Sequence, residues 1–313
     1  MTTPEEWRGK QVLITGATGF IGRHLVRRLS GARAQIFAAA SPSHGPAPRP
    51  AETKPTLQRL AFDIRDAVAV RSTLDEVKPD IVFHLAAVGV TNPSVDPMLA
   101  LMVNGGGVIN LLEGLRGRRM ERVVLVGTCH EYGASTEDGG LDPRNAYSAS
   151  KVAAWAFGRM YWRAHRLPVT TVRPFQVYGP GQSERALIPS AVKAALTGED
   201  FPMTPGKQVR DFVFVEDVVD GMLAAALSDA AEGKSLDLGT GRGSTVLHAV
   251  ERIWQLTRAK GQIRAGALSY RTGAAMNLVA DADRTYQETG WRARTFLEEG
   301  LQATVHQLIP GER

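Results

Sequence analysis

The sequence predicts an α/β fold built on a doubly wound parallel sheet, with a smaller mixed α/β lobe toward the C-terminus. Short runs rich in β-branched residues alternate with longer amphipathic segments through the first two thirds of the chain. A glycine-rich turn follows the first of these runs, and the turns between the others are short. Such alternation is typical of right-handed βαβ units, whose helices cover both faces of a sheet.

Each element is predicted from its own stretch of sequence. The strand-like runs lie at Gln11–Thr15, Ala34–Ala38, Ile81–Leu85, Arg122–Val126 and Val169–Val172. The segments with helical periodicity lie near 20–30, 66–77, 95–116 and 144–166. Ser41–Pro50 is rich in proline, with Pro55 shortly after it, and is predicted to be an exposed loop.

The alternation loosens beyond Pro174. Residues 175–210 are rich in Gly, Pro and polar side chains, 212–238 return to a strand–helix–strand pattern, and 262–313 are mixed. We therefore predict a larger domain of residues 1–174 plus about 211–240. The smaller lobe would consist of about 175–210 plus 241–313.

The composition is that of an ordinary globular enzyme. Of 313 residues, 43% are apolar and 22% are charged, and the net charge is +5. No basic cluster of the kind that follows a nucleic-acid backbone is present, so the charge favours small anionic ligands. The single cysteine, Cys129, excludes an internal disulfide and a cysteine-rich zinc site. Without an N-terminal apolar segment or a long apolar run, we expect a cytoplasmic protein that is not inserted in a membrane.

The glycine loop Gly16–Gly22 follows the first strand and opens the first helix. Gly16 allows a tight turn, Gly19 lets the backbone approach a diphosphate, and Gly22 allows close helix–strand packing. Free N–H groups and the positive dipole end at the helix start attract an anion. In this context the loop predicts dinucleotide binding by Gly16, Thr18, Gly19, Phe20, Ile21 and Gly22.

A second glycine-rich loop, Gly239–Gly243, comes late in the chain. We interpret it as a structural turn rather than a second phosphate loop. Thr245 is then placed to cap the helix that follows.

Tyr147 and Lys151 are one helical turn apart, so their side chains share a helix face. Tyrosine has an ordinary pKa of about 10, too high for proton exchange at neutral pH. A neighbouring ammonium stabilises the phenolate and is expected to lower that pKa. Thr128, just after the strand Arg122–Val126, offers a hydroxyl to the substrate oxygen. We predict that Thr128, Tyr147 and Lys151 are the catalytic residues.

Together with the glycine loop, this pair resembles the extended branch of the short-chain dehydrogenase/reductase family, the nucleotide-sugar epimerases, dehydratases and 4-ketoreductases. The resemblance covers nearly the whole chain and includes the segments Asp63–Asp66, His84–Ala87, Val103–Gly105, Arg173–Gly181 and Arg210–Val218. It implies a Rossmann-type domain, a nicotinamide dinucleotide and an NDP-sugar in the cleft to the smaller lobe. It also implies a homodimer formed through the helices near 95–116 and 144–166, although their apolar faces are equally compatible with a core.

The resemblance also assigns individual residues. Cofactor contacts beyond the glycine loop fall on Ser41, Asp63, Ile64, Leu85, Ala86, Ala87, Asn104, Tyr147, Lys151 and Pro174. Substrate contacts fall on Ser94, Cys129, His130, Gln176, Arg210 and Arg271. The guanidinium groups of Arg210 and Arg271 suit a diphosphate, and surface salt bridges are the alternative role for both. No metal is predicted.

Two departures from the family pattern concern ligands. Gln176 stands where the family often has Asn, so the extra methylene leaves its substrate contact open. The second strand ends at Ala38–Ser41 without the acidic residue that binds the ribose 2′-hydroxyl of NAD. Since an acid there would repel a 2′-phosphate, we predict NADP, with NAD as the alternative. Ser41, His44 and Arg49 are the candidates to hold the phosphate.

The third departure concerns the reaction. Sugar 4,6-dehydratases of this family carry Thr-Asp-Glu-Val-Tyr-Gly, whose Asp and Glu perform the elimination across C5–C6. Aligned on Tyr132–Gly133, this chain has Thr128–Cys129–His130–Glu131. In this alignment Glu131 comes one position later than the Glu of the dehydratases. On an extended backbone, which we expect here, its side chain points the other way.

On the same extended backbone, Cys129 and His130 face opposite sides, which argues against a Cys–His nucleophile. Two potential ligands alone also do not make a tetrahedral zinc site. We therefore predict that Cys129 lines the pocket. His130 either faces the substrate or has a structural role.

The predicted function is reduction of an NDP-4-keto-6-deoxyhexose at C4 by an NAD(P)-dependent enzyme. The missing dehydratase carboxylates argue against elimination, and the missing NAD-type acid favours net reduction with NADPH. Met203–Phe212 resembles 4-ketoreductases, although epimerases carry similar runs. An NAD-dependent NDP-sugar 4-epimerase is the alternative. A 4,6-dehydratase is less favoured. A non-catalytic dinucleotide-binding protein is also less favoured, because binding alone does not require Tyr147.

Overall fold

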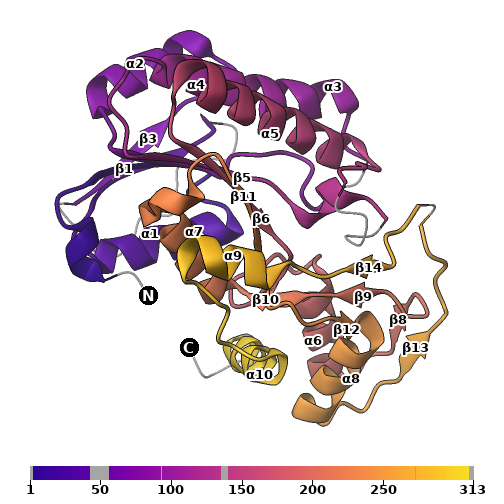
Figure 1. Cartoon of the computed structure of the whole chain (residues 1–313). Coiled ribbons are helices and arrows are strands. Elements are labelled where there is room, and N and C mark those ends of the chain that lie inside the picture. Colours follow the sequence, from indigo (N-terminus) through magenta and orange to yellow (C-terminus); the bar gives the residue numbers. More distant parts are fainter. Residues whose placement is uncertain (1–2, 43–55, 93, 135–139, 272, 310–313) are drawn as a thin grey trace.

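A seven-stranded parallel sheet forms the larger part of the molecule (Figure 1). Its strands run in the spatial order β3-β2-β1-β4-β5-β6-β11. Their bounds are β1 Gln11–Thr15, β2 Gln35–Ala40, β3 Leu57–Ala61, β4 Ile81–His84, β5 Arg122–Val126, β6 Val169–Pro174 and β11 Ser235–Leu238. The strand order reverses between β1 and β4, which is where open α/β sheets bind their ligands.

The structure is a computed structural model and describes residues 3–42, 56–92, 94–134, 140–271 and 273–309. Most of the predicted proline-rich loop lies outside these residues, as do His44 and Arg49. The predicted strands agree with β1 and β5 residue for residue, and the other three differ only at their ends. Strand β3 was not predicted because this edge strand carries Gln58 and Arg59 and has no strongly apolar pattern.

Helices cover both faces of the sheet (Figure 1). One face carries α2 (Ala67–Val77), α4 (Gly107–Leu115) and α5 (Ala146–His165), and the other carries α1 (Phe20–Gly31) and α7 (Val215–Leu227). Successive strand residues point to opposite faces. Leu13 accordingly packs in the core cluster under α2 and α4, and Ile14 in the cluster under α1 and α7. The predicted doubly wound, Rossmann-type fold is confirmed.

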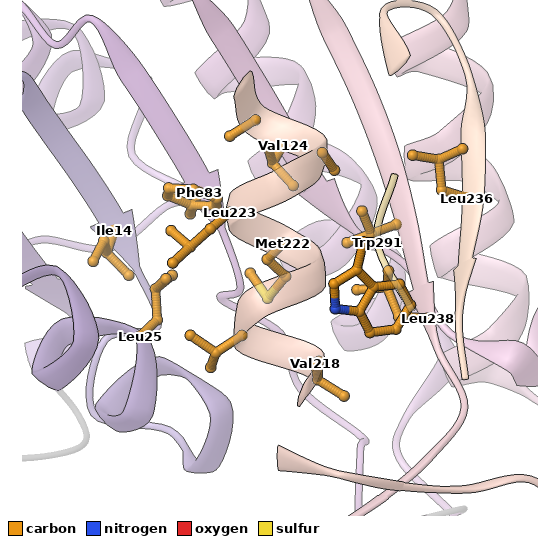
Figure 2. Packing of buried hydrophobic residues seen from close by; sticks show 14 of the residues in the cluster. Ile14, Leu25, Phe83, Val124, Val218, Met222, Leu223, Leu236, Leu238 and Trp291 are labelled. Carbon is orange, nitrogen blue, oxygen red and sulfur yellow. The ribbon is translucent and has the colours of Figure 1, made fainter. Parts of the chain in front are cut away.

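The core beneath α7 joins early strands of the sheet to a segment from late in the chain (Figure 2). Leu223 of α7 lies beside Phe83 of β4, and Trp291 lies beside Leu238 of β11. A Cβ on Gly221 would come within 2.9 Å of both Leu238 and Trp291, so the glycine lets the helix close on the indole. Trp291 follows α9 (Ala282–Thr289), so this late segment packs on the large sheet. The domain boundary near residue 240 stays a prediction.

The helix predicted near 95–116 consists of three pieces. These are α3 (Pro97–Ala100), the π-helix η3 (Leu101–Gly106) and α4. A π-helical turn is rare and often marks a functional site. Within the described residues, Pro97–Leu115 is long and apolar enough to cross a membrane, but 56% of its apolar window is buried inside the fold. A helix between two layers of a folded domain has the same composition.

The smaller lobe contains short strands and helices beside the large sheet (Figure 1). Its helices are α6 Leu187–Thr197, α8 Val246–Thr257 and α10 Leu297–Leu308. Its strands are β7 Gln176–Tyr178, β8 Phe201–Met203, β9 Val209–Arg210, β10 Phe212–Phe214, β12 Ser244–Thr245, β13 Ile263–Ala265 and β14 Asn277–Leu278. They form the pairs β10–β7 and β13–β8 and the sheet β12–β9–β14. Their core includes Tyr178, Phe212 and Val250, which confirms a mixed α/β lobe.

The second glycine loop is a turn held by one buried carboxylate. Asp211 accepts hydrogen bonds from the main-chain N–H groups of Thr240 and Gly241, both at 2.9 Å. It also accepts one from the N–H of Ala280 at 3.2 Å. Thr245 caps α8 by accepting a hydrogen bond from the N–H of His248 at 3.1 Å. The predicted structural role of this loop and its cap is confirmed.

Candidate active site

The glycine loop makes a turn in which close main-chain contacts leave no room for side chains. Gly16 has φ +69°, and a Cβ there would come within 2.7 Å of main-chain atoms of Leu85 and Ala86. A Cβ on Gly22 would lie 2.3 Å from the carbonyl oxygen of Gly16. Gly19 is the N-cap of α1, whose first turn holds no acidic residue. The first-turn N–H groups have no intrahelical partners, so the turn fits the diphosphate of a dinucleotide.

Several predicted cofactor residues gather at the carboxyl edge of the sheet. Leu85, Ala86 and Ala87 follow β4, and the N–H of Leu85 donates to the carbonyl of Thr15 at 3.1 Å. The N–H of Ala86 is 3.4 Å from the Thr15 hydroxyl. Ser41 follows β2, and Pro174 ends β6. Leu85–Ala87 lie where the strand order reverses between β1 and β4, whereas Ser41 lies one strand from this point and Pro174 two strands from it on the other side.

Asp63 and Ile64 follow β3 at the same edge. Ile64 packs against α4, where a Cβ on Gly107 would lie 2.7 Å from it. The Asp63 carboxylate forms a bidentate pair with Arg65, with contacts of 2.6 and 3.0 Å. This pairing lowers the pKa of Asp63, so the carboxylate is ionised and already bound to Arg65.

Asn104 lies on the π-helix, and its side chain is buried. Its amide exchanges two hydrogen bonds with the main chain of Val88, at 2.9 and 3.1 Å. It also donates to the hydroxyl of Ser150 at 2.9 Å, and Ser150 donates to the carbonyl of Tyr147 at 2.8 Å. Asn104 therefore ties the loop after β4 to the helix that carries Tyr147. Its predicted direct contact with the cofactor stays a prediction.

Thr128, Tyr147 and Lys151 meet at the carboxyl end of β5, and each side chain is less than one tenth exposed. Helix α5 begins at Ala146 behind the N-cap Asn145, which places Tyr147 in the first turn. The Thr128 hydroxyl lies close enough to Tyr147 to lower the pKa of its phenol. The Lys151 ammonium donates to the carbonyl of Val126 at 2.9 Å and lies 6.0 Å from the centre of the Tyr147 ring. The structure thus brings the three predicted catalytic residues together.

Burial shifts the pKa values of this pair in opposite directions. Loss of hydration lowers the pKa of Lys151 to about 8, and the negative charge of Glu131 opposes this change. Loss of hydration also raises the pKa of Tyr147, which the nearby Thr128 hydroxyl partly offsets. Burial therefore raises the pKa of Tyr147 overall in the free protein, instead of leaving it below the ordinary value. The predicted effect of Lys151 on this pKa stays a prediction.

The residues Cys129–Tyr132 are not extended, contrary to prediction. Cys129–Tyr132 form a 3-10 helix, η4, for which Thr128 is the N-cap. Glu131 is fully buried, and its carboxylate accepts hydrogen bonds from the N–H of Thr128 at 2.9 Å and Nε of Arg173 at 2.7 Å. The predicted orientation of Glu131 assumed an extended backbone, whereas this residue lies in a 3-10 helix. The carboxylate lies inside the protein, bound to Arg173, and is closed to a substrate.

Cys129 and His130 differ sharply in exposure. Cys129 is buried in the core cluster, where loss of hydration raises the pKa of its thiol to about 12. Since the thiolate is the nucleophilic form, this thiol is unreactive at neutral pH. His130 is exposed. Partial loss of hydration and the positive charge of Arg210 lower the pKa of its imidazole. A neutral imidazole thus lies on the open side of η4 near Arg210.

The predicted substrate residues are only partly gathered. Arg210 ends β9, near Cys129 and His130, and its guanidinium donates to the carbonyls of Val209 and Ala275, both at 2.7 Å. Gln176 begins β7, and its N–H donates to the carbonyl of Asp211 at 2.9 Å. Ser94 and Arg271 lie on exposed loops. The structure therefore places Arg210 beside η4, and the contacts of the other three with a substrate stay predictions.

Two buried groups beside the site were not foreseen. Arg173, near the end of β6, was noted only as part of a family segment, although an arginine inside an apolar strand signals a buried carboxylate partner. His84 ends β4, and its Nδ1 lies 2.7 Å from the Thr15 hydroxyl. Loss of hydration and the charge of Lys151 lower the pKa of His84 to about 3, so the ring is neutral. Among the described residues, no three His, Cys, Asp or Glu side chains gather as metal ligands.

Comparison with known proteins agrees with this arrangement. Residues 12–239 match the NAD dependent epimerase/dehydratase family. The chain is 31% identical to a UDP-glucose 4-epimerase of Mycolicibacterium smegmatis, over 94% of this chain and 97% of the relative. It is 28% identical to a dTDP-glucose 4,6-dehydratase of Haemophilus influenzae, over 94% of this chain and 96% of the relative. The structure of Thermus thermophilus UDP-glucose 4-epimerase in complex with NAD matches with a TM-score of 0.82 and 26% identity, over 95% of this chain and 98% of that one.

Proposed function

The chain belongs to the NAD dependent epimerase/dehydratase family, and on that premise we propose that it reduces an NDP-4-keto-6-deoxyhexose at C4. The observation that carries the proposal is the chemistry of η4. Cys129 is a buried, protonated thiol, His130 is neutral, and the carboxylate of Glu131 is bound to Arg173. Elimination across C5–C6 needs an acid and a base open to the substrate, and η4 offers no free carboxylate.

Reduction at C4 requires a proton for the developing alkoxide. Burial raises the pKa of Tyr147, so the phenol keeps its proton in the site and is suited to donate it. Lys151 carries its charge below a pH of about 8 and stabilises the phenolate that remains after the transfer. A bound nicotinamide would supply the hydride. The chain itself holds the oxygen, provides the proton and excludes water.

We propose NADP as the cofactor, held by the glycine loop and by Leu85–Ala87. Ser41 and Pro42, the described residues after β2, carry no carboxylate that would repel a 2′-phosphate. NAD is the second candidate, because the similar Thermus thermophilus epimerase structure contains NAD. We assign the diphosphate of the sugar nucleotide to Arg210, with Arg271 as a further contact. Tyr270, the neighbour of Arg271, interacts with the charge of Arg210, which supports placing them together.

An NAD-dependent 4-epimerase is the second candidate function. It is favoured by the 31% identity to a UDP-glucose 4-epimerase over nearly the full length of both chains. In that reaction Tyr147 would first remove a proton from the substrate hydroxyl, and its raised pKa opposes this first step.

Cofactor content separates the two functions. We expect the purified protein, denatured and examined by ultraviolet absorbance and mass spectrometry, to release no NAD. It should then oxidise NADPH stoichiometrically with dTDP- or UDP-4-keto-6-deoxyglucose. Stoichiometric NAD in the purified protein, with interconversion of UDP-glucose and UDP-galactose, would overturn the reductase and establish the epimerase.

We also propose that two copies associate through α3, η3 and α5. Large apolar side chains are exposed on these helices, which pack against one another. They are Met98 of α3, Leu101 and Met102 of η3, and Phe157 and Met160 of α5. Such a surface is unusual on a monomer and suits a twofold contact. Sedimentation velocity should show a dimer that becomes monomeric in the variant Met102→Glu/Phe157→Glu. A monomeric wild-type protein would contradict this assignment.

A further inference from the structure

A buried ion pair lies directly beneath the catalytic residues. The side chains of Glu131 and Arg173 are 0% and 5% exposed, and Nε of Arg173 is 2.7 Å from the Glu131 carboxylate. The guanidinium of Arg173 lies over the rings of Tyr132 and Trp155, at 5.2 and 5.6 Å from their centres. A buried carboxylate without such a partner would be costly. The pair therefore holds the Glu131 carboxylate in a fixed position inside the site, balanced by the guanidinium of Arg173.

The same carboxylate organises the main chain at Thr128. Its other oxygen accepts the hydrogen bond from the Thr128 N–H at 2.9 Å, which completes the capping box of η4. It also approaches Gly127 so closely that a Cβ there would lie 2.4 Å from it. Gly127 and Thr128 are thus both held by Glu131. The position of the Thr128 hydroxyl against Tyr147 depends on this contact.

Glu131 also acts on both proton-carrying groups of the site. Its charge favours the ammonium of Lys151 and disfavours the phenolate of Tyr147. The other charged or titratable groups that act on the pair are Cys129, which is a protonated thiol, and His84, which is neutral. Among the ionised groups around Lys151, Glu131 is therefore the counter-charge.

The geometry points to Glu131 as a positioning residue that fixes Thr128 against Tyr147 and sets the charge of the Tyr147–Lys151 pair for proton donation. The inference rests on the proposed reduction, in which Tyr147 gives its proton to the C4 oxygen. Glu131 itself touches neither substrate nor cofactor. Arg173 is its support, because it allows the charge to be buried.

The sign of the effect on pH dependence follows directly. Reduction needs the protonated pair, so activity is present below the pKa of Lys151 and is lost as the pH rises through about 8. Glu131→Gln keeps an oxygen for the Thr128 N–H but removes the charge. Lys151 and Tyr147 then lose their protons at lower pH, so the falling limb of the profile moves by about one pH unit toward acid.

A titration of Lys151 tests this without any substrate. Protein labelled with [6-¹³C]lysine is titrated by NMR, with Lys151→Arg identifying the signal. We expect the Lys151 midpoint to fall by about one pH unit in Glu131→Gln. Because that variant leaves Arg173 unpaired, the double variant Glu131→Gln/Arg173→Met carries the same test with neither charge buried. A midpoint that moves by less than about 0.3 unit in the folded variants overturns the inference.

The matched control is Glu113→Gln on α4, which removes a carboxylate that accepts a hydrogen bond from Tyr161 far from the site. It should leave the Lys151 midpoint and the pH profile unchanged. With NADPH and dTDP-4-keto-6-deoxyglucose, the two Glu131 variants should lower kcat while KM changes less than about threefold. A shifted Lys151 midpoint with no reduction of any 4-keto sugar would sink the proposed function and leave the role of Glu131 intact.

Discussion

The glycine loop Gly16–Gly22 and the segment Gly127–Gly133 both follow strands of the same sheet, but different contacts hold them. In the first, main-chain atoms of Leu85, Ala86 and Gly16 leave no room for side chains. In the second, Gly127 is confined by the Glu131 carboxylate, which is in turn fixed by Arg173. A backbone-built site is recognisable from spacing alone, whereas a site built on a buried ion pair depends on a partner elsewhere in the chain.

The substitution Tyr147→Phe should separate catalysis beside Gly127–Gly133 from cofactor binding at Gly16–Gly22 most completely. It removes the proton donor, so we expect kcat to fall about 10³-fold, within the range of general acid catalysis. Because we assign cofactor binding to the glycine loop, the Kd for NADPH, measured by fluorescence, should change less than about threefold. If activity survives, Tyr147 is not the proton donor and the enzyme function of this site is wrong.

Gly16→Ala should lower both the stability of the protein and its affinity for NADPH. The new methyl group meets the main chain of Leu85 and Ala86 at a positive φ, which we expect to cost about 3 kcal/mol in the free energy of unfolding. The NADPH Kd should rise at least tenfold. Gly117→Ala is the matched control, because Gly117 has φ +78° but no atom within 4 Å of its Cβ position. It should cost only about 1 kcal/mol in urea unfolding. Equal costs would show that backbone strain alone matters.

Gly127→Ala tests whether a side chain confines the second region. Its methyl group would meet the Glu131 carboxylate, so its cost should shrink when Glu131→Ala is already present. We expect a coupling of about 1–2 kcal/mol in a double-mutant cycle of unfolding free energies. Gly22→Ala, which meets only main chain, should combine additively with Glu131→Ala. If both glycine variants are additive with Glu131→Ala, Gly127 is not confined by the Glu131 side chain and the two regions do not differ in this respect.

The smallest expected effect concerns the charges behind the second region. Asp237 accepts a hydrogen bond from the hydroxyl of Tyr132 at 2.8 Å, and burial raises its pKa to about 6. Because this folded-state pKa lies above the ordinary value, its contribution to stability is present at low pH and is lost as the pH rises from about 4 to about 6. Asp237→Asn should therefore stabilise the protein by about 1 kcal/mol at pH 8 and by less at pH 4.

Urea unfolding at the two pH values measures this difference. The glycine loop contains no titratable side chain, so Gly16→Ala should show the same cost at both. The predicted direction would be contradicted if the gain in unfolding free energy of Asp237→Asn over wild type were smaller at pH 8 than at pH 4.

Much of the fold could be predicted because its signals are local. β1 and β5 are short apolar runs, and their bounds were predicted residue for residue. Edge strand β3 was missed because its side chains are only partly buried and carry little pattern. The π-helical break in the helix near 95–116 was also missed, because helical periodicity does not distinguish a π turn from an α turn.

The candidate site divides in the same way. Spacing alone was enough to identify Gly16–Gly22 and the Tyr147/Lys151 pair. The conformation of Cys129–Tyr132 was predicted as extended and is a 3-10 helix, because a buried contact with Arg173 decides it. The direction of the Tyr147 pKa was also missed, since loss of hydration depends on the packing around the ring.

The sequence by itself determined the parallel sheet, the tight glycine turn after β1 and the placement of Tyr147 and Lys151 one helical turn apart, because these depend on neighbours within one or two turns of chain. Only the tertiary structure decided that Glu131 is a buried counter-charge rather than an exposed acid. The reason is that Glu131 lies in η4 after β5 and Arg173 lies in β6, so the two are joined only when β5 and β6 pair in the sheet.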